Sequence, residues 1–496
     1  LLRGDNLLFS DLKLNEDEPI YIQIKNYIDA MINKGLIPNN SKLPSTRELS
    51  QFLNVSRNSI ISAYEELKSE GIIYSVSGKG TFVNHKNIIS KNSWNINFDL
   101  LENEYSKIAN KMDIVKSEIP WRSDLISFKS ISPDGELFDI DEVKKSFLNR
   151  ISLEGHKILN YGYAKGYKPL IDYLLSYMNI KGVDTSNKDI LITNGFTEGL
   201  DIILSSFTEK GDYIICENPT HNTAIKIFKS LGLNIIGIDI NKNGIDFNKF
   251  KEDLYKIKLD KSIKIKFAYI TPSYHNPTGI VMSPEDRYKF YNIMKENNIA
   301  IIEDGFNEEL LYTSSHIFPI ASLDNLNNGV IYIGSFSKIL FPGIRIGWIL
   351  CDKDVIKKLE SVKRCKSIHV SFLDQAILYD YLSNGAFDKY VKKIRKFYGD
   401  KFNFAYECVQ RYIPNEYILG EGGLHIFIKL KDLDSRIVLE RCYEKGVIFM
   451  PGDIFYIGEN GRNTLRLGIS RVSMENMEKG IKIIGEVVKD LMKYKK

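Results

Sequence analysis

The sequence predicts a multidomain chain, in which a small helical domain with a β-hairpin precedes a larger α/β domain that ends in a smaller α+β part. At 496 residues the chain is too long for one hydrophobic core. Residues 15–85 show helical periodicity and turn signals, and from residue 121 to residue 496 short apolar runs alternate with helical stretches. Residues 86–120 are rich in Asn, Lys, Ser and Glu and predict a linker between the two domains.

The composition excludes several classes of protein. Hydrophobic residues make up 43% and charged residues 26% of the chain, as in soluble globular proteins. The five cysteines show no zinc spacing, and their odd number argues against a disulfide framework, so we expect no metal site and a reducing compartment. No run approaches the roughly 18 apolar residues of a membrane span, and five acidic residues within the first 20 argue against a signal peptide. We therefore expect a cytoplasmic protein without a membrane partner. The net charge of +4 is too small to imply nucleic acid by itself.

The first domain has the pattern of three helices and a hairpin. Residues 20–31 repeat apolar side chains at helical spacing. Residues 45–48 read Ser-Thr-Arg-Glu, a capping box that starts a second helix. Ser56 caps a third helix, and residues 72–83 read strand, glycine turn, strand. Together these elements predict a winged helix-turn-helix.

In a helix-turn-helix, the N-terminal residues of the second helix meet base edges in the major groove. Here those residues are Arg57, Asn58 and Ser59. Arginine can donate two hydrogen bonds to guanine and asparagine can pair with adenine. Arg47 is placed for a phosphate, and Lys79 on the hairpin turn can reach the flanking backbone. On these residues alone, a helix-turn-helix that binds no DNA remains an alternative.

Five segments of this domain resemble the GntR-type winged-helix pattern, namely LPSTREL (43–49), VSRN (55–58), AYEEL (63–67), EG (70–71) and GKGTFV (78–83). The resemblance covers about 65 residues. It implies double-stranded operator DNA as a partner, contacted by Arg47, Arg57 and a glycine-rich wing that includes Lys79 and Gly80.

Seven apolar runs predict the buried strands of a largely parallel sheet in a large part of about 150–350: 190–193, 213–216, 235–238, 267–270, 300–303, 330–334 and 347–350. Beyond about residue 355, helical segments precede two further strand-like runs at 424–430 and 465–469. This arrangement is typical of a smaller α+β part that extends to residue 496.

Four segments that follow apolar runs suit a phosphorylated pyridine aldehyde. Lys338, in Ser-Phe-Ser-Lys, supplies an amine for a Schiff base, and Asp304 can hold a pyridine nitrogen protonated. Asn276 can donate to a phenolic oxygen, residues 195–197 offer backbone donors at a helix start, and Arg345 adds a positive charge for a phosphate. Each residue alone has an ordinary alternative, such as a surface lysine, a helix cap, an Asx turn, a packing glycine or a surface ion pair.

The order of these segments resembles the fold-type I enzymes of the aspartate aminotransferase superfamily, which use pyridoxal 5′-phosphate (PLP). The resemblance implies the α/β PLP-dependent transferase fold, with Lys338 forming the Schiff base. It implies a cofactor site formed by Lys338, Asp304, Asn276, Phe196, Thr197, Ser335, Ser337, Arg345, Tyr161, His221 and Phe306. Tyr161 matches a tyrosine that reaches the phosphate across a dimer. Arg466 matches an arginine that binds the carboxylate of a substrate or effector, its alternative being an exposed strand arginine.

Two positions depart from this superfamily. Phe306 follows Asp304 where a tyrosine usually bonds the phenolic oxygen, and His221 stands where an aromatic ring usually stacks on the pyridine. Losing a phenol should raise the pKa of the internal aldimine, because one hydrogen bond to its deprotonated oxygen is missing. PLP binding is therefore expected, and efficient transamination is in doubt.

A GntR-type domain joined to an aminotransferase-like domain is similar to the MocR subfamily of GntR-type transcription regulators, across nearly the whole chain. The resemblance implies a DNA-binding regulator that senses PLP, or an amino compound that forms an external aldimine with PLP. It also implies a head-to-tail, domain-swapped homodimer. Two alternatives remain: an active amino acid aminotransferase with an auxiliary DNA-binding domain, and a cofactor-free dimerisation scaffold.

Overall fold

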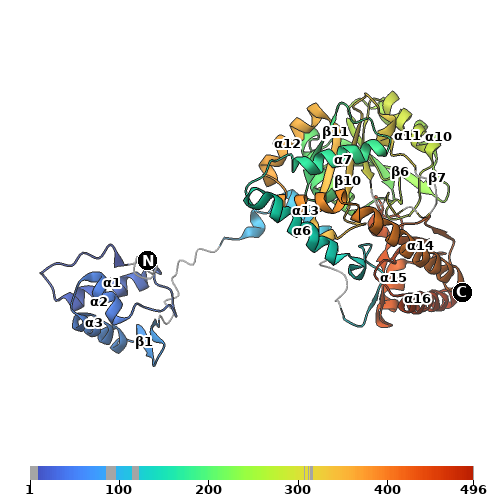
Figure 1. The fold of residues 1–496 in the computed structure, drawn as a ribbon. Coiled ribbons are helices and arrows are strands. Elements are labelled where there is room, and N and C mark those ends of the chain that lie inside the picture. Colours follow the sequence, from blue (N-terminus) through green and yellow to red (C-terminus); the bar gives the residue numbers. More distant parts are fainter. Residues whose placement is uncertain are drawn as a thin grey trace. The chain divides into compact units, whose positions relative to one another are not determined.

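The computed structural model describes residues 9–84, 96–113, 122–305, 308–310, 312 and 317–494 (Figure 1). The chain divides into two compact units, Leu1–Leu101 and Glu102–Lys496. Within the described ranges, no helix combines the length and the apolar character needed to cross a bilayer.

The first unit is a winged helix. It contains α1 (Ile20–Asn33), α2 (Thr46–Leu53), α3 (Arg57–Ser69) and the antiparallel hairpin of β1 (Ile73–Val76) and β2 (Gly80–Val83). The predicted helices and hairpin are therefore confirmed. The capping box forms as predicted, because Ser45 Oγ accepts from Glu48 N and Glu48 Oε2 accepts from Ser45 N. The inward faces of the helices and the hairpin enclose one hydrophobic core.

The second unit is built on an eight-stranded sheet in the order β4-β11-β10-β9-β8-β5-β6-β7. Its strands are β4 (Lys188–Thr193), β5 (Tyr213–Asn218), β6 (Asn234–Asn241), β7 (Gly244–Ile245), β8 (Ile265–Ile270), β9 (Ala300–Gly305), β10 (Val330–Ser335) and β11 (Gly347–Asp352). All seven predicted runs lie in these strands. Only β11 and β7 run against the other strands, so the sheet is largely parallel, as expected.

Helices cover both faces of this sheet. Side chains of α8 (Gly195–Phe207), α9 (Asn222–Ser230) and α12 (Lys353–Ser367) share a core with one face. Those of α7 (Lys168–Ile180), α10 (Phe247–Leu259), α11 (Pro284–Glu296), α13 (Phe372–Ser383) and α14 (Ala386–Tyr412) pack on the other. In β4, Leu191 belongs to the first core and Ile190 and Ile192 to the second, as the alternation of strand side chains requires.

The smaller part contains a four-stranded sheet of β12 (Tyr417–Leu419), β13 (His425–Lys429), β16 (Thr464–Gly468) and β15 (Met450–Pro451). This sheet shares a core with α14, α15 (Ser435–Glu444) and α16 (Met474–Tyr494). β3 (Ile126–Ser127) pairs in parallel with β14 (Val447–Ile448), so residues from the start of the second unit join its C-terminal part. Among the described residues of the second unit, short 3-10 helices connect these elements: η3 (Gly135–Leu137), η4 (Gly155–Leu159), η5 (Ile320–Leu323), η6 (Pro342–Ile344) and η7 (Gly452–Phe455).

Most of the predicted linker at 86–120 lies outside the described residues. Its described portion contains η2 (Phe98–Leu100) and α4 (Glu104–Lys111). α4 packs on α9, and Glu104 pairs with Lys210 at 2.5 Å. α6 (Ile140–Glu154) follows in the second unit and leads into η4.

Candidate functional site

The start of α3 presents two of the predicted base-reading residues. Ser56 caps the helix by accepting from Ser59 N, and the two serine hydroxyls lie 2.9 Å apart, so the Ser59 side chain takes part in the cap. Arg57 and Asn58 are exposed, and Arg57 Nε donates to Thr46 Oγ1 of α2 at 3.3 Å. The helix start therefore offers a guanidinium and an amide to an outside partner.

Arg47 on α2 and Lys79 on the hairpin turn are also exposed. The wing has one residue that the sequence did not indicate. Gly80 has φ +121°, and a Cβ there would lie 2.6 Å from Lys42 Cε, so glycine admits the Lys42 side chain beside the wing. Lys42 precedes the helix-turn-helix in the sequence, and only the fold brings it to the hairpin.

The predicted cofactor residues gather at the carboxyl edge of the large sheet. Asp304 is the penultimate residue of β9, Lys338 follows β10, and Asn276 follows β8. Burial first, and then the positive charges of Arg466, Arg345 and Arg471, lower the pKa of Lys338 to about 8, whereas the charge of Asp304 acts to raise it. These charges therefore act on one lysine, whose amine is partly neutral near pH 8.

Asp304 is buried beside a tyrosine that the sequence reasoning missed. The Tyr269 hydroxyl donates to Asp304 Oδ2 at 2.7 Å. Burial, with the charges of Glu217 and Glu308, raises the pKa of Asp304 to about 7 against the opposing hydrogen bond from Tyr269. The sequence indicates Tyr269 only as part of an apolar strand, because the contact of its hydroxyl depends on the pairing of β8 with β9.

The first turn of α8 forms a cradle suited to an anion. Gly195 has φ +78°, and a Cβ there would lie 2.8 Å from Arg345 Nη2, so only glycine lets the guanidinium approach. Arg345 Nη2 donates to Asn194 O at 3.3 Å. Ser335 and Ser337 share a hydroxyl hydrogen bond of 3.0 Å at the end of β10. A helix N-terminus, a guanidinium and hydroxyls are the donors that a phosphate requires.

Aromatic rings lie beside this cradle. Phe196 follows Gly195 in α8, and its ring centroid lies 5.6 Å from that of His221. Burial lowers the pKa of His221 to about 3, helped by the charges of Lys338, Arg466 and His275, so its imidazole is neutral near pH 7. Thr197 is exposed in the same helical turn. Phe306 lies outside the described residues.

Arg466 of β16 is buried without a carboxylate partner among the described residues. Its Nη1 donates to Asn276 Oδ1 at 2.7 Å and its Nη2 to Lys129 O at 3.1 Å, whereas its buried Nε has no partner among them. Burial lowers the pKa of Arg466 to about 9. Because Asn276 accepts through Oδ1, its amide nitrogen remains available as a donor. The Arg466 guanidinium is complementary to a ligand carboxylate, and the amide nitrogen of Asn276 is complementary to a neighbouring ligand oxygen.

Tyr161 does not join these residues within one chain. Its side chain is 86% exposed, and its ring meets that of His369 edge-on with centroids 5.9 Å apart.

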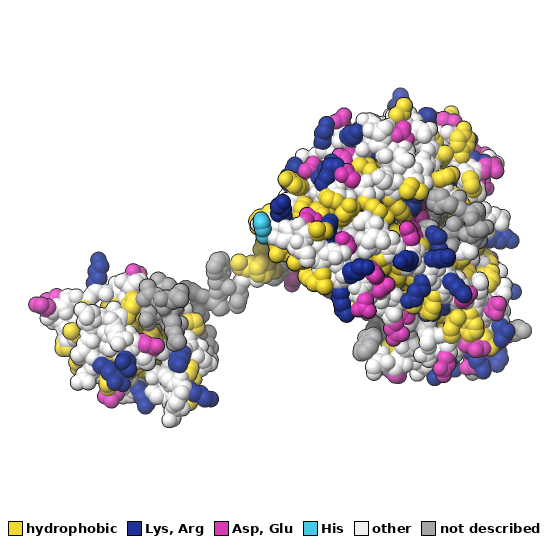
Figure 2. All heavy atoms as spheres, viewed as in Figure 1, with side chains coloured by type: hydrophobic (Ala, Val, Ile, Leu, Met, Phe, Trp, Pro, Cys, Tyr) yellow, Lys and Arg dark blue, Asp and Glu magenta, His cyan; other side chains and the backbone are white. Residues whose placement is uncertain are grey.

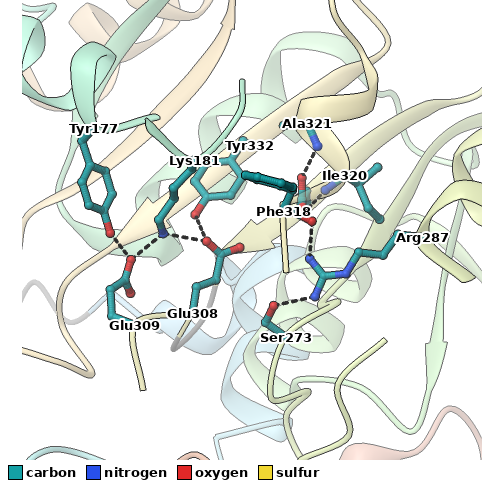
Figure 3. Close-up of polar contacts among 11 residues, drawn as sticks. Tyr177, Lys181, Ser273, Arg287, Glu308, Glu309, Phe318, Ile320, Ala321 and Tyr332 are labelled. Atoms are coloured by element: carbon teal, nitrogen blue, oxygen red, sulfur yellow. Dashed lines mark hydrogen bonds and ion pairs between the residues drawn. The ribbon is translucent and has the colours of Figure 1, made fainter. Parts of the chain in front are cut away.

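A buried charge cluster that the sequence reasoning missed forms around Glu308 and Glu309, which follow Asp304 in the chain (Figure 3). Lys181 Nζ contacts Glu308 Oε2 at 2.7 Å and Glu309 Oε1 at 2.5 Å. The Tyr332 hydroxyl donates to Glu308 at 3.0 Å, and the Tyr177 hydroxyl donates to Glu309. Burial alone would lower the pKa of Lys181, yet Glu308 and Glu309 raise it well above its usual value. The cluster therefore fixes the segment after Asp304 with an ammonium that stays charged.

Arg287 is 2% exposed. It connects the loop that carries Asn276 with the segment that comes after Asp304 in the chain. It donates to three acceptors within residues 272–282 and to Phe318 O at 2.9 Å. Figure 3 shows its guanidinium beside Ser273. The residue before Asp304, Glu303, accepts from the backbone N–H groups of residues 320 and 321 at 2.7 Å each.

The residues fit PLP group by group. Lys338 offers the amine, Asp304 the partner for a pyridine nitrogen, Asn276 a donor for the phenolic oxygen, and the α8 cradle the donors for a phosphate. When bound, PLP supplies an aldehyde that condenses with amines and a ring that withdraws electrons. No group of His, Cys, Asp or Glu within the described ranges could hold a metal ion.

Comparisons with known proteins agree with the winged helix of the first unit and with the aminotransferase-like fold of the second. Residues 123–484 match the family model of aminotransferase class I and II, and residues 20–83 match that of bacterial regulatory proteins of the gntR family. The uncharacterized HTH-type transcriptional regulator YdfD of Bacillus subtilis (strain 168) is 29% identical over 97% of this chain and 99% of its own.

The HTH-type transcriptional regulator NorG of Staphylococcus aureus (strain USA300) is 27% identical over 90% of this chain and 99% of its own. The crystal structure of a multiple substrate aminotransferase from Thermococcus profundus matches with a TM-score of 0.74 and 30% identity, covering 80% of this chain and all of that one. These matches identify PLP as the cofactor of the fold. The chain belongs to the aminotransferase class I and II family and carries a gntR-family DNA-binding domain at its N-terminus, which is the MocR architecture.

Proposed function

We propose that this protein is a PLP-dependent, DNA-binding transcription regulator that senses PLP or an amino compound that reacts with it. The observation that carries the proposal is that one chain combines a helix start that exposes Arg57 and Asn58 with a buried lysine, Lys338, whose pKa is set by Asp304 of the large part and Arg466 of the smaller part. The relatives that match nearly the whole chain are named transcriptional regulators, and this supports transcription regulation as the role of a chain that combines the two units. Because its target is chromosomal DNA, we assign it to the cytoplasm.

In the proposed site, Lys338 binds the cofactor covalently and Asp304 pairs with its ring nitrogen. Asn276 donates to its phenolic oxygen, while His221 lies against the ring. The phosphate is bound by the α8 N-terminus, with Phe196 and Thr197 in its first turn, and by Ser335, Ser337 and Arg345. Burial of Lys338, which lowers its pKa to about 8, supports its role because a neutral amine is the reactive form.

We further propose that the effector carries a carboxylate as well as an amine. The support is Arg466, a buried guanidinium that no described carboxylate neutralises. Filling this site with an anion would relieve the cost of the isolated charge. Because Arg466 belongs to the smaller part and Lys338 to the large part, an effector that engages both favours one arrangement of the two parts. Such differential affinity is what allosteric control of the DNA-binding unit requires.

We also propose a homodimer. Seven large apolar side chains between residues 140 and 163 are 40–86% exposed: Ile140, Phe147, Leu148, Leu153, Leu159, Tyr161 and Tyr163. Figure 2 shows hydrophobic side chains gathered on the face that carries α6. Apolar surface of this extent is typical of an interface between subunits. A partner subunit seated there would cover Tyr161, which supports the prediction that this tyrosine completes the phosphate site of the other chain.

The experiment that tests the proposal begins with the full chain and PLP. Binding sites are selected from a random DNA library, and affinity for the selected duplex is then measured by fluorescence anisotropy with and without PLP and amino acids. We expect a PLP absorbance band that is lost in Lys338→Ala, and an operator affinity that changes by at least about fivefold when the cofactor or effector is added. The operator affinity of Lys338→Ala should be the same with and without PLP and amino acids.

Two results would contradict the proposal. One is an operator affinity that stays the same when PLP or any of the tested amino acids is added. The other is the absence of any selected sequence, together with sustained turnover of an amino acid with a 2-oxo acid acceptor, which would make the chain an aminotransferase. A colourless protein that stays colourless with PLP would indicate the cofactor-free scaffold.

A further inference from the structure

A cavity of about 410 Å³ lies between the large and small parts of the second unit. The large part contributes Glu217 of β5, Ile240 of β6, both residues of β7 and several residues between 271 and 286. The small part contributes Tyr406 of α14 and residues 418–421. Its described lining does not include Lys338, Asp304, Arg345 or Arg466, so the cavity is distinct from the predicted cofactor position.

Two buried polar residues belong to the lining of this cavity. Glu217 and His275 are each 2% exposed. Glu217 Oε2 accepts from Thr271 N at 2.8 Å and lies 3.3 Å from His275 Nε2, and no described residue donates to Oε1. His275 Nε2 itself is buried and makes no hydrogen bond within the described part of the chain. Oε1 therefore leaves one acceptor of the Glu217 carboxylate open to a cation, besides the imidazole of His275 that faces Oε2.

The rest of the lining mixes polar and apolar side chains and carries an excess of negative charge. Asp286 and Glu421 add two carboxylates to that of Glu217, against the single ammonium of Lys242. Phe247 and Tyr406 contribute aromatic rings, which attract cations through their faces. Aliphatic side chains complete the lining: Ile240, Ile245, Ile280, Val281, Met282, Ile418 and Leu419.

We propose that this cavity is a second ligand site, which takes a small organic cation with an apolar body. The cation pairs with Glu217, and the apolar body packs against the aliphatic lining. The site is separate from the one that binds PLP, and its occupation involves no covalent step.

The position of the cavity couples it to the rest of the unit. Glu421 N donates to Gly279 O at 3.0 Å, and Val281 N donates to Glu421 Oε1 at 3.0 Å, so the small part is hydrogen-bonded to the loop that carries Asn276. Glu217 is also one of the charges that raise the pKa of Asp304. A cation beside Glu217 offsets that charge and favours the ionised form of Asp304, so ligand binding in the cavity acts on the cofactor site.

The test uses benzyltrimethylammonium, because a quaternary ammonium cannot condense with PLP. Binding to the full-length, PLP-loaded protein is measured by isothermal titration calorimetry, with phenylacetate as the anionic counterpart. We expect a dissociation constant below about 10 mM for the cation, and at least about tenfold weaker binding of phenylacetate. Ile245→Trp, which fills the cavity from β7, should weaken binding of the cation by at least about tenfold. Ile437→Trp, at a position on α15 that is 51% exposed, is the matched control.

Lys338→Ala separates this inference from the proposed function, since it should keep the affinity for the cation while losing the PLP band. Equal binding of phenylacetate, or no loss of affinity in Ile245→Trp, would overturn the second site. A loss of cation binding in Lys338→Ala, but not in Ile245→Trp, would place the cation in the cofactor pocket and would overturn it as well.

Discussion

The surroundings of Lys338 determine when its amine is neutral. Burial and three arginines lower its pKa to about 8. The neutral fraction then rises from about one tenth at pH 7 to about nine tenths at pH 9, whereas at an ordinary lysine pKa it would rise about a hundredfold. We therefore predict that the second-order rate of PLP capture by the apoprotein increases about tenfold between pH 7 and pH 9 and levels off above pH 9.

Stopped-flow absorbance across this pH range measures the rate, and Lys338→Ala is the control for non-covalent binding. A rate that still climbs steeply above pH 9 would show that the lysine has an ordinary pKa, and would contradict the environment described for it.

The sequence predicts the site residues that lie at or just after a strand. It does not predict the residues that reach the site only through the packing of other elements. Asp304, Asn276 and Lys338 each come at or just after an apolar run, and parallel strands bring such positions to one edge. Tyr269 and Lys181 carry no such signal, since one lies within a buried strand and the other ends a helix. Their contacts depend on the pairing of strands and on the packing of α7, which residue spacing does not specify.

At the scale of elements, Lys181 at the end of α7 neutralises two carboxylates on the segment after β9. Removing one partner of a buried ion cluster typically costs about 3–5 kcal/mol, because the remaining charges are left without compensation. We predict a loss of this order for Lys181→Met in urea unfolding of the second unit, followed by circular dichroism.

Two further variants test the cause of that loss. Lys181→Met combined with Glu308→Gln and Glu309→Gln removes the unpaired charges and should recover most of the stability. Lys210→Met breaks only an exposed pair with Glu104 and should leave the stability almost unchanged. If Lys181→Met and Lys210→Met cost the same, the cluster would not be a buried electrostatic anchor.

The start of α3 and the hairpin turn are expected to contribute differently to DNA binding. Arg57 is the first residue of α3, which we propose meets base edges, whereas Lys79 lies on the hairpin turn, which we propose lies beside the DNA backbone. We predict that Arg57→Ala weakens binding to the selected operator by about 1–3 kcal/mol and relaxes its sequence preference. Lys79→Ala should weaken all sequences alike and reduce the slope of affinity against salt by about one. Anisotropy titrations on matched and mismatched duplexes distinguish the two effects, and a salt slope that changes only in Arg57→Ala would reverse the assignment.

The existence of the elements could be predicted because buried strands read as apolar runs and amphipathic helices repeat their faces. Strand direction could not, since β11 is as apolar as its neighbours yet runs antiparallel to β10. The pairing of β3 with β14 also leaves no trace in sequence, because each strand has only two residues and the two lie far apart along the chain.

At the scale of the whole molecule, the proposed regulation needs two copies of the chain. The side chain of Tyr161 is exposed in its own chain, and apolar side chains near it in the sequence are exposed as well in the part of the chain that the structure describes. A symmetric dimer would cover this surface and present two DNA-binding units to repeated half-sites, so that two weak contacts act as one strong contact. Dimerisation, PLP retention and operator affinity should therefore be lost together.

We predict that Leu148→Asp combined with Leu153→Asp, on the exposed face of α6, converts the protein from a dimer of 57.0 kDa chains into monomers. Two carboxylates in an apolar interface leave buried charges without partners, which opposes association. Sedimentation velocity measures the mass, and the same samples should bind the selected operator at least about tenfold more weakly and release PLP faster. Leu259→Asp, at the end of α10 and 66% exposed, is the matched control and should remain dimeric. A parent protein that sediments as a monomer, or a double variant that stays dimeric, would remove α6 from the interface and leave the exposure of Tyr161 without explanation.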